Sequence, residues 1–154
     1  MSDIATERFD VANRLFLRLY QASNQLHKTG TRAVAAQGAT TQQWAVLGAL
    51  SRPRSRAQGM TVKALAAFLM VSRQNLTLVL DRLERAGLIE RARAEGDGRL
   101  RHVMLTPHGD AVWQQMQPAI RGFYAAALDG FTTEEAVTLY RLLDRLRDGL
   151  AALD

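Results

Sequence analysis

The sequence predicts a mainly α-helical fold with a small β-hairpin. Three observations lead to this prediction: apolar stripes with helical spacing at both ends of the chain, two short helical segments joined by a brief turn, and a glycine-rich hairpin tip after them. With 154 residues, of which 47% are hydrophobic and 23% charged, the chain has the size and composition of one globular domain. We therefore expect a single domain over residues 1–154.

Both ends of the chain are predicted to be long helices. In the first, roughly Ile4–Lys28, apolar side chains recur at alternating spacings of four and three residues. The positions are Ala5, Phe9, Ala12, Phe16, Leu19, Ser23 and Leu26. The last helix follows a capping-box signature of Thr132 and Glu135. It repeats the spacing through Leu139, Leu143, Leu146, Leu150 and Leu153. Such narrow stripes either pack against each other within one chain or form a dimer interface.

A shorter helix is predicted after residue 40. Thr40 and Gln43 form a second capping box, and the helix continues to Leu50. It is expected to stop in the segment SRPRSRAQG at 51–59, which its Pro, Gly and Ser content predicts to be a loop.

The next two helices are predicted to form a helix-turn-helix. A short helix near Val62–Phe68 is followed by a brief turn and by a helix that Ser72 caps and that ends at Arg85. Gly87 is expected to follow that end in the left-handed conformation. The helical period places one set of side chains inward, Leu76, Val79, Leu80 and Leu83, and another largely outward, Arg73, Gln74, Thr77, Leu78 and Asp81.

A β-hairpin is predicted next, with strands over Leu88–Arg93 and Arg99–Leu105. Gly96 and Gly98 on either side of Asp97 supply the positive φ that tight turns need. Arginines alternate along both strands, at Arg91, Arg93, Arg99 and Arg101. Like charges facing each other across strands repel, so an anion bound from outside the chain would reduce the repulsion between these arginines. The alternative is a solvated hairpin in an arginine-rich chain.

The helix after the hairpin is expected to be capped by Thr106 and to begin at Pro107, a favoured position for proline. Its apolar residues are Val112, Trp113, Met116, Ile120, Phe123 and Ala127. Pro118 lies inside the pattern and is expected to kink or interrupt the helix.

The positive charge is concentrated in the middle of the chain. Residues 52–101 carry eleven basic and five acidic side chains, a net charge of +6, whereas residues 1–51 carry +2 and residues 102–154 carry −3. A basic middle third between more neutral ends is typical of a nucleic-acid-binding module within a larger frame.

Taken together, residues 40–106 predict a winged helix-turn-helix. The second helix of this module enters the major groove of DNA with its N-terminal residues at the base edges. The run Ser72-Arg73-Gln74-Asn75 suits that role, since arginine pairs with guanine and both amides pair with adenine. We also expect Arg82 of this helix, and Arg99 and Arg101 of the hairpin, to contact DNA.

Other function classes find little support. The chain has no cysteine, no P-loop, no glycine-rich dinucleotide motif and no Ser/His/Asp pattern, so we expect no enzyme, no metal and no cofactor. The three histidines His27, His102 and His108 have no metal-ligand spacing. The longest uncharged run, Ala33–Ser51, is broken by glutamines and threonines, and the N-terminus lacks an export signal. We therefore expect a cytoplasmic protein with no membrane partner.

Several stretches resemble the MarR family of transcriptional regulators. They are TTQQWAVLGAL at 40–50, LAAFLMVSRQNLTLVLDRLERAGLIER at 65–91 and DGRLRHVMLTPHG at 97–109. The last is the most specific, because the wing of this family carries Asp-x-Arg followed by an apolar strand and Leu-Thr-x-x-Gly. The matching positions here are Asp97, Arg99, Leu105, Thr106 and Gly109.

The resemblance implies a homodimer joined by its terminal helices, 4–30 and 107–153, that binds a pseudo-palindromic site on double-stranded DNA. By position, Arg99 is the wing-tip arginine and Asp97 its orienting partner. The recognition-helix contacts implied are Ser72, Arg73, Gln74, Asn75 and Thr77.

The chain also departs from the family pattern at three places. Met70 lies where the turn often has glycine, and a left-handed backbone there would cost about 1 kcal/mol. Leu78 occupies a position that is often basic or polar, so contact there would be apolar, to a thymine methyl group. The arginines at 52–56 either form a solvated loop or contact phosphate or an anionic ligand.

The family resemblance further implies a small-molecule effector that usually lowers DNA affinity. Candidate ligand residues, chosen by residue type, are Tyr20, His27, Arg32, Trp44 and Trp113. An aromatic carboxylate or its coenzyme A thioester would suit the arginines. The leading hypothesis is therefore a ligand-released repressor, and the alternative is a constitutive architectural DNA-binding protein without effector.

Overall fold

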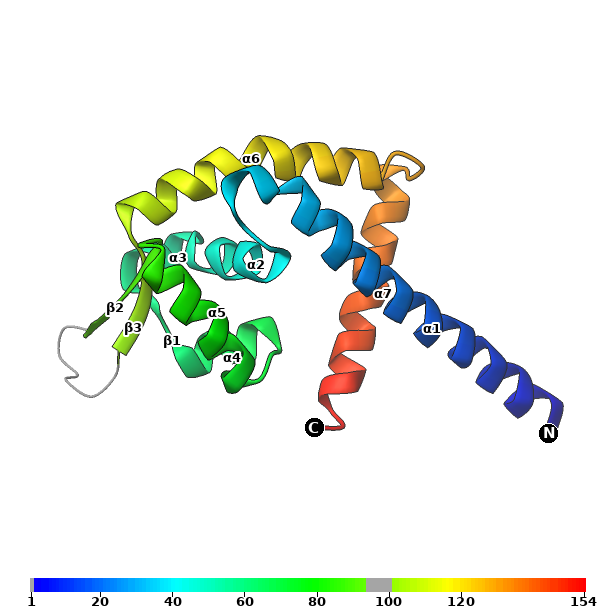
Figure 1. The fold of residues 1–154 in the computed structure, drawn as a ribbon. Helices are drawn as coiled ribbons and strands as arrows, with labels where there is room; N and C mark the ends of the chain where they lie inside the picture. Colours follow the sequence, from blue (N-terminus) through cyan, green and yellow to red (C-terminus); the bar gives the residue numbers. More distant parts are fainter. Residues whose placement is uncertain (1, 94–100) are drawn as a thin grey trace. The chain divides into compact units, whose positions relative to one another are not determined.

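The computed structural model describes residues 2–93 and 101–154, and it is mainly helical with one small sheet (Figure 1). Its helices are α1 (Ser2–Ala33), the 3-10 turn η1 (Ala35–Gln37), α2 (Thr41–Leu50), α3 (Pro53–Gln58), α4 (Val62–Leu69), α5 (Arg73–Arg85), α6 (Pro107–Ala127) and α7 (Thr133–Ala151). Its strands are β1 (Met60–Thr61), β2 (Ile89–Arg93) and β3 (Arg101–Leu105), in the antiparallel order β1-β3-β2. The predicted fold class is confirmed.

The chain divides into two compact units, which meet inside α6. The first ends at Ile120 and the second is Arg121–Asp154. Among the described residues, buried apolar side chains lie only in the first unit, where they come from α2, α4, α5, the sheet and the N-terminal half of α6. The largest fully buried side chains are Leu47, Leu50, Leu65, Leu76, Leu80, Leu83, Ile89 and Met116.

Side-chain caps fix where the helices begin, as predicted. Both capping boxes form: Thr40 accepts from the Gln43 amide while the Gln43 side chain accepts from the Thr40 amide, and Thr132 and Glu135 do the same. The Ser72 hydroxyl oxygen accepts from the Asn75 amide at 3.2 Å and so starts α5. These bonds satisfy amides that have no partner within the helix.

The helix-turn-helix contains one strained residue. Met70 ends α4 with φ 54° and ψ 43°, and it is the one non-glycine residue with positive φ among those described. The expected left-handed backbone at this turn is therefore present, at a cost of about 1 kcal/mol for a residue with a Cβ. Gly87, with φ 71°, follows the end of α5 as predicted.

The structure departs from the sequence expectation at Pro53 and narrows it at Pro118. The 51–59 segment is not a loop, because Pro53 begins α3 and Gly59, with φ 69°, ends it. Proline at the first helical position loses no hydrogen bond, so here it starts a helix instead of breaking one. Of the two outcomes predicted for Pro118, a kink or an interruption, the interruption is absent, because α6 continues through it with Met116 and Ile120 buried on either side.

Other boundaries differ in extent. The helix predicted over 4–28 extends over all of α1, from Ser2 to Ala33. The two-residue strand β1 was not predicted, and it pairs Met60 with Val103.

A tight junction joins the end of β3 to the end of α5. The Thr106 amide donates to the Leu88 carbonyl at 3.1 Å, and the Thr106 hydroxyl donates to the Gly87 carbonyl at 2.5 Å. The same hydroxyl oxygen accepts from the Gly109 amide at 2.9 Å and caps α6. Gly109 is buried, and a Cβ added to it would overlap the carbonyl oxygen of Leu88. The Leu-Thr-x-x-Gly run therefore holds the hairpin, α5 and α6 together.

The terminal helices expose the apolar stripes predicted from sequence. On α1, Phe9, Phe16 and Leu26 are exposed. On α7, in the second unit, Leu139, Leu143 and Leu150 are exposed as well. Within the described residues, no helix is long and apolar enough to cross a membrane.

Candidate nucleic-acid interface

The first turn of α5 presents the side chains expected to contact bases. Arg73, Gln74 and Asn75 are all exposed, directly after the Ser72 cap. The buried stripe of Leu76, Leu80 and Leu83 holds the other side of the helix in the core. Because the helix is anchored on one face, its polar face is presented at a fixed orientation.

Two further predicted contacts lie on the same helix. Thr77 is exposed, and its hydroxyl donates to the Arg73 carbonyl at 2.8 Å, so the oxygen keeps acceptor capacity for an outside donor. Arg82 is exposed two turns after the first turn. All the predicted recognition-helix residues are therefore on the surface of one helix.

The hairpin brings two arginines opposite each other. In the β2–β3 register, the last described pair before the tip is Arg93 and Arg101, and Arg101 is exposed. The exposed Arg101 can therefore contact an anion outside the chain. Asp97 and Arg99 at the tip lie outside the described residues.

Arg91 is paired within the chain, which corrects the expectation that the hairpin arginines need an anion from outside. Its guanidinium lies 2.8 Å from Asp81 Oδ1 and 3.0 Å from Glu84 Oε2, both on α5. The half-buried Arg91 therefore ties β2 to the recognition helix and offsets one of the two negative charges there. The helical period predicts an outward position for Asp81 but no partner, because the ion pair crosses from helix to strand.

The arginines at 52–56 are also engaged within the chain. The Arg52 guanidinium lies 4.8 Å from the centre of the Phe68 ring, a cation–π contact. Arg56 forms an ion pair with Asp110 at 2.7 Å, which links α3 to the first turn of α6. Arg54 is exposed. Two of these three arginines thus help to hold the fold.

A pocket of about 260 Å³ lies behind the recognition helix, within the first unit. Its wall comes from the end of α1, from α2, from the turn after α4 and from α5: His27, Thr41, Gln42, Ala45, Val46, Leu69, Val71, Asn75, Leu76 and Val79. His27 Nδ1 and Thr41 Oγ1 are 2.6 Å apart in a hydrogen bond. The polar groups of this wall are amide, hydroxyl and imidazole groups, without any arginine or lysine.

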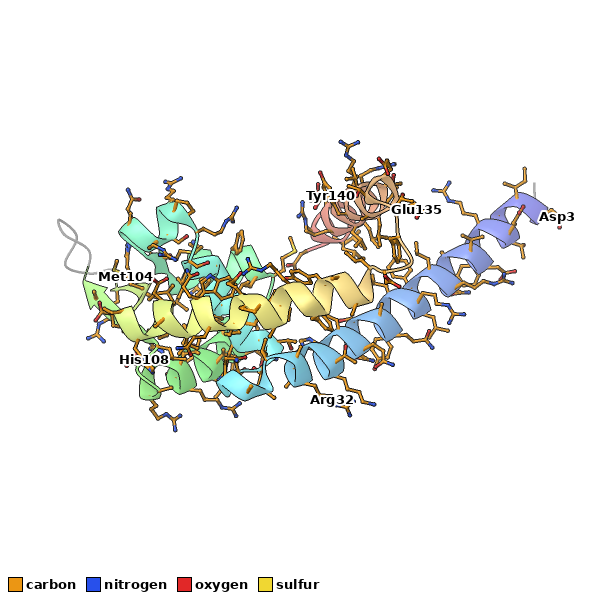
Figure 2. The ribbon with its side chains drawn as sticks, turned by 90° about the horizontal axis from the view of Figure 1, so that it is seen from above. Asp3, Arg32, Met104, His108, Glu135 and Tyr140 are labelled. Carbon is orange, nitrogen blue, oxygen red and sulfur yellow. The ribbon has the colours of Figure 1, made fainter. Side chains whose placement is uncertain are left out.

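Of the five ligand residues predicted by type, only His27 lines this pocket. Trp44 is buried in the core, and the Trp113 indole packs over Gly48 of α2, so close that a Cβ there would lie 3.1 Å from it. Tyr20 and Arg32 are exposed on α1, where Figure 2 labels Arg32. Thr41, Gln42 and Asn75 also line the pocket, and they were not predicted as ligand residues. The capping box at Thr40 predicts where α2 begins, but it does not predict which residues the first turn of α2 faces.

The described residues bring no three His, Asp or Glu side chains together in a way that could hold a metal ion.

The arrangement of helices, sheet and exposed recognition helix matches known proteins. A model of the MarR family matches residues 37–100. The transcriptional activatory protein BadR of Rhodopseudomonas palustris is 50% identical over 151 residues, which cover 97% of this chain and 86% of that protein. The chain belongs to the MarR family.

Two further MarR comparisons concern function and structure. The homoprotocatechuate degradative operon repressor of Escherichia coli is 30% identical over 130 residues, covering 84% of this chain and 85% of the repressor. The transcriptional regulator MosR of M. tuberculosis, solved in complex with DNA, superposes with a TM-score of 0.76 at 27% identity, covering 89% of this chain and 96% of that one. The family and these relatives are transcriptional regulators.

Proposed function

We propose that this MarR-family regulator is a cytoplasmic homodimer that binds a pseudo-palindromic operator through α5 and the hairpin and is released by a small aromatic effector. The observation that carries the DNA-binding part is the Ser72-capped first turn of α5. It exposes one guanidinium and two amides, at Arg73, Gln74 and Asn75, on a helix held in place by a buried stripe.

The hairpin supports the same proposal from electrostatics. Arg101 is exposed on β3, where its positive charge can contact phosphate. The proposed backbone and groove contacts are Arg101 with Arg99, oriented by Asp97, and Arg82 on α5. The exposed apolar stripes on α1 and α7 support the proposed dimer, because exposed apolar surface of this kind often marks an interface.

The pocket supports an aromatic effector. A cavity of about 150 Å³ holds benzene, so the 260 Å³ found here suits one substituted ring and leaves any coenzyme A portion outside. Because no arginine or lysine lines it, the pocket favours a phenol or the aryl group of a thioester over a free carboxylate. The Escherichia coli relative supports the same choice, because it is named for the operon that degrades homoprotocatechuate, which is an aromatic compound.

The proposed direction of regulation is repression, the direct result of occupying a promoter that a ligand then frees. The Rhodopseudomonas palustris relative is named as an activatory protein, so a reporter fusion in cells with and without the gene must test this. Higher expression without the gene supports repression. Lower expression would show that the protein is an activator, and the proposed DNA and ligand sites would stand unchanged.

The experiment that tests DNA recognition is fluorescence anisotropy with DNA from upstream of the gene and scrambled DNA of equal length, at two salt concentrations. We expect selective binding to the upstream DNA. Arg73→Ala or Gln74→Ala should reduce selectivity at particular base pairs by about 1–3 kcal/mol, whereas Arg101→Ala should weaken binding to all sequences and flatten the salt dependence. Equal, steeply salt-dependent binding to both DNAs would instead favour the architectural, effector-free alternative.

The effector is tested on the same complex. Phenol, benzoate and benzoyl-coenzyme A are titrated into protein bound to labelled operator. His27→Ala, inside the pocket, should raise the effector concentration needed for release, while Arg32→Ala, on the exposed side of α1, should not. If Arg32→Ala alone has the effect, the effector binds outside this pocket.

A further inference from the structure

One apolar side chain stands alone on the polar face of α5. Leu78 is 59% exposed, whereas Leu76, Leu80 and Leu83 on the same helix are at most 2% exposed. Each residue turns an α-helix by about 100°, so Leu78, two residues from both Leu76 and Leu80, lies on the face opposite the core. Packing in the first unit therefore does not use this side chain.

The surroundings of Leu78 are polar. Its neighbours one turn away on the helix surface are Gln74, Asn75, Asp81 and Arg82, of which all but the half-buried Asp81 are exposed. Single exposed leucines are common on protein surfaces, so exposure alone carries no inference. The position does, because the proposed function places this face against base edges, and the inference rests on that function.

In the major groove, a leucine has only one apolar group to contact. Adenine, guanine and cytosine present hydrogen-bonding groups there, and thymine adds its 5-methyl group. A leucine against the other bases would take polar groups out of water without replacing their hydrogen bonds. Against thymine it buries apolar surface on both sides.

We propose that Leu78 contacts the 5-methyl group of a thymine and so makes a T·A pair a requirement at one position of each operator half-site. The helix geometry limits where that thymine lies. Leu78 is four residues, about 6 Å along the axis, from Gln74. Since base pairs are about 3.4 Å apart, the thymine lies within two base pairs of the pair that Gln74 contacts.

The test removes the methyl group from the DNA and the isobutyl group from the protein. Each operator thymine is replaced in turn by deoxyuridine, which lacks only that methyl group, and the dissociation constant is measured by anisotropy. We expect one thymine per half-site at which deoxyuridine weakens wild-type binding by about fivefold, in keeping with the burial of one methyl group. Leu78→Ala removes the contact from both half-sites, so it should lose about the square of that factor on normal DNA and bind both DNAs equally.

Matched controls separate this contact from other effects. Arg82→Ala, one turn away, should weaken binding but keep the full difference between thymine and deoxyuridine. Leu78→Ala should unfold at the same temperature as wild type, because the side chain is exposed. If wild type prefers the operator but no deoxyuridine matters, or if Leu78→Ala remains sensitive to the same deoxyuridine, this inference is overturned while the proposed function stands. Failure of wild type to distinguish operator from scrambled DNA would overturn both.

Discussion

Gly109 shows how one missing side chain sets the geometry of the DNA-binding region. Its Cα approaches the Leu88 backbone too closely for a Cβ, while Thr106 bonds to both Gly87 and Leu88. The start of α6 can therefore lie directly on the turn that ends α5. A glycine in this role is needed for space and not for backbone freedom.

Replacing Gly109 with alanine should therefore be costly. We expect Gly109→Ala to lower the free energy of unfolding by about 3 kcal/mol, at the upper end for overpacking, because the obstacle is backbone that cannot rotate away. Urea denaturation measures this.

Gly122→Ala is the matched control on the same helix, since a Cβ there meets nothing within 4 Å. It should stabilise the protein by about 0.5–1 kcal/mol, as alanine does in helix interiors. Equal effects of the two substitutions would contradict the argument from the Leu88 contact.

Features that depend on residues within one helical turn of each other could be predicted from the sequence. The caps at Thr40, Ser72 and Thr132 and the left-handed Gly87 formed where local rules place them. Their hydrogen bonds join residues at most three apart, so the sequence contains all the information needed.

At the scale of elements, local rules were ambiguous. The composition around Pro53 predicts a loop, but Pro53 begins α3. The residues after it are able to continue the helix, and Gly59 ends it. What keeps α3 in place is distant in sequence: Arg56 pairs with Asp110, and the Gln58 carbonyl is 2.7 Å from His102 Nδ1. The short strand β1 likewise exists only because β3 is beside it.

Arg91 provides a prediction about how α5 and β2 are joined. Removing it leaves Asp81 and Glu84 without their common partner, next to the proposed phosphate contacts. Because the three side chains are partly exposed, Arg91→Gln should cost only about 1 kcal/mol of stability, and less at high salt. The larger effect should be on DNA, with affinity lowered about tenfold by two unpaired carboxylates.

The control for Arg91→Gln is Arg54→Gln, which removes the same charge from an exposed position of α3. It should change DNA affinity much less. Adding Asp81→Asn and Glu84→Gln to Arg91→Gln should restore most of the affinity. If the triple variant stays as weak as the single one, Arg91 contributes by contacting DNA directly.

At the scale of the whole molecule, the pocket could not be predicted by residue type. His27, Thr41 and Asn75 come from three helices, and their meeting depends on how α1, α2 and α5 pack. Three of the residues predicted by type lie outside the pocket. The large side chains of Trp44 and Trp113 pack within the fold, and Arg32 is exposed.

The terminal helices lead to a prediction about assembly. A chain that ends before Thr132 lacks α7 and its exposed leucines, and we expect it to sediment as a monomer. In the full-length chain, Leu143→Glu should have the same effect by placing a charge in the proposed interface, with helical content unchanged by circular dichroism. Thr132→Ala, which costs only a helix cap of about 1 kcal/mol, should remain dimeric. A truncated chain that is still a dimer would exclude α7 from the interface.

Asn75 belongs both to the wall of the pocket and to the first turn of α5. On the proposed function, effector and operator therefore address the same side chain, and their binding equilibria are linked. Linkage is reciprocal: by whatever factor the effector weakens the operator, the operator weakens the effector. The effector concentration needed for release then rises with operator strength. As the effector concentration rises, genes with weak operators would be released first and genes with strong operators last. The order of expression would therefore follow the order of operator affinities.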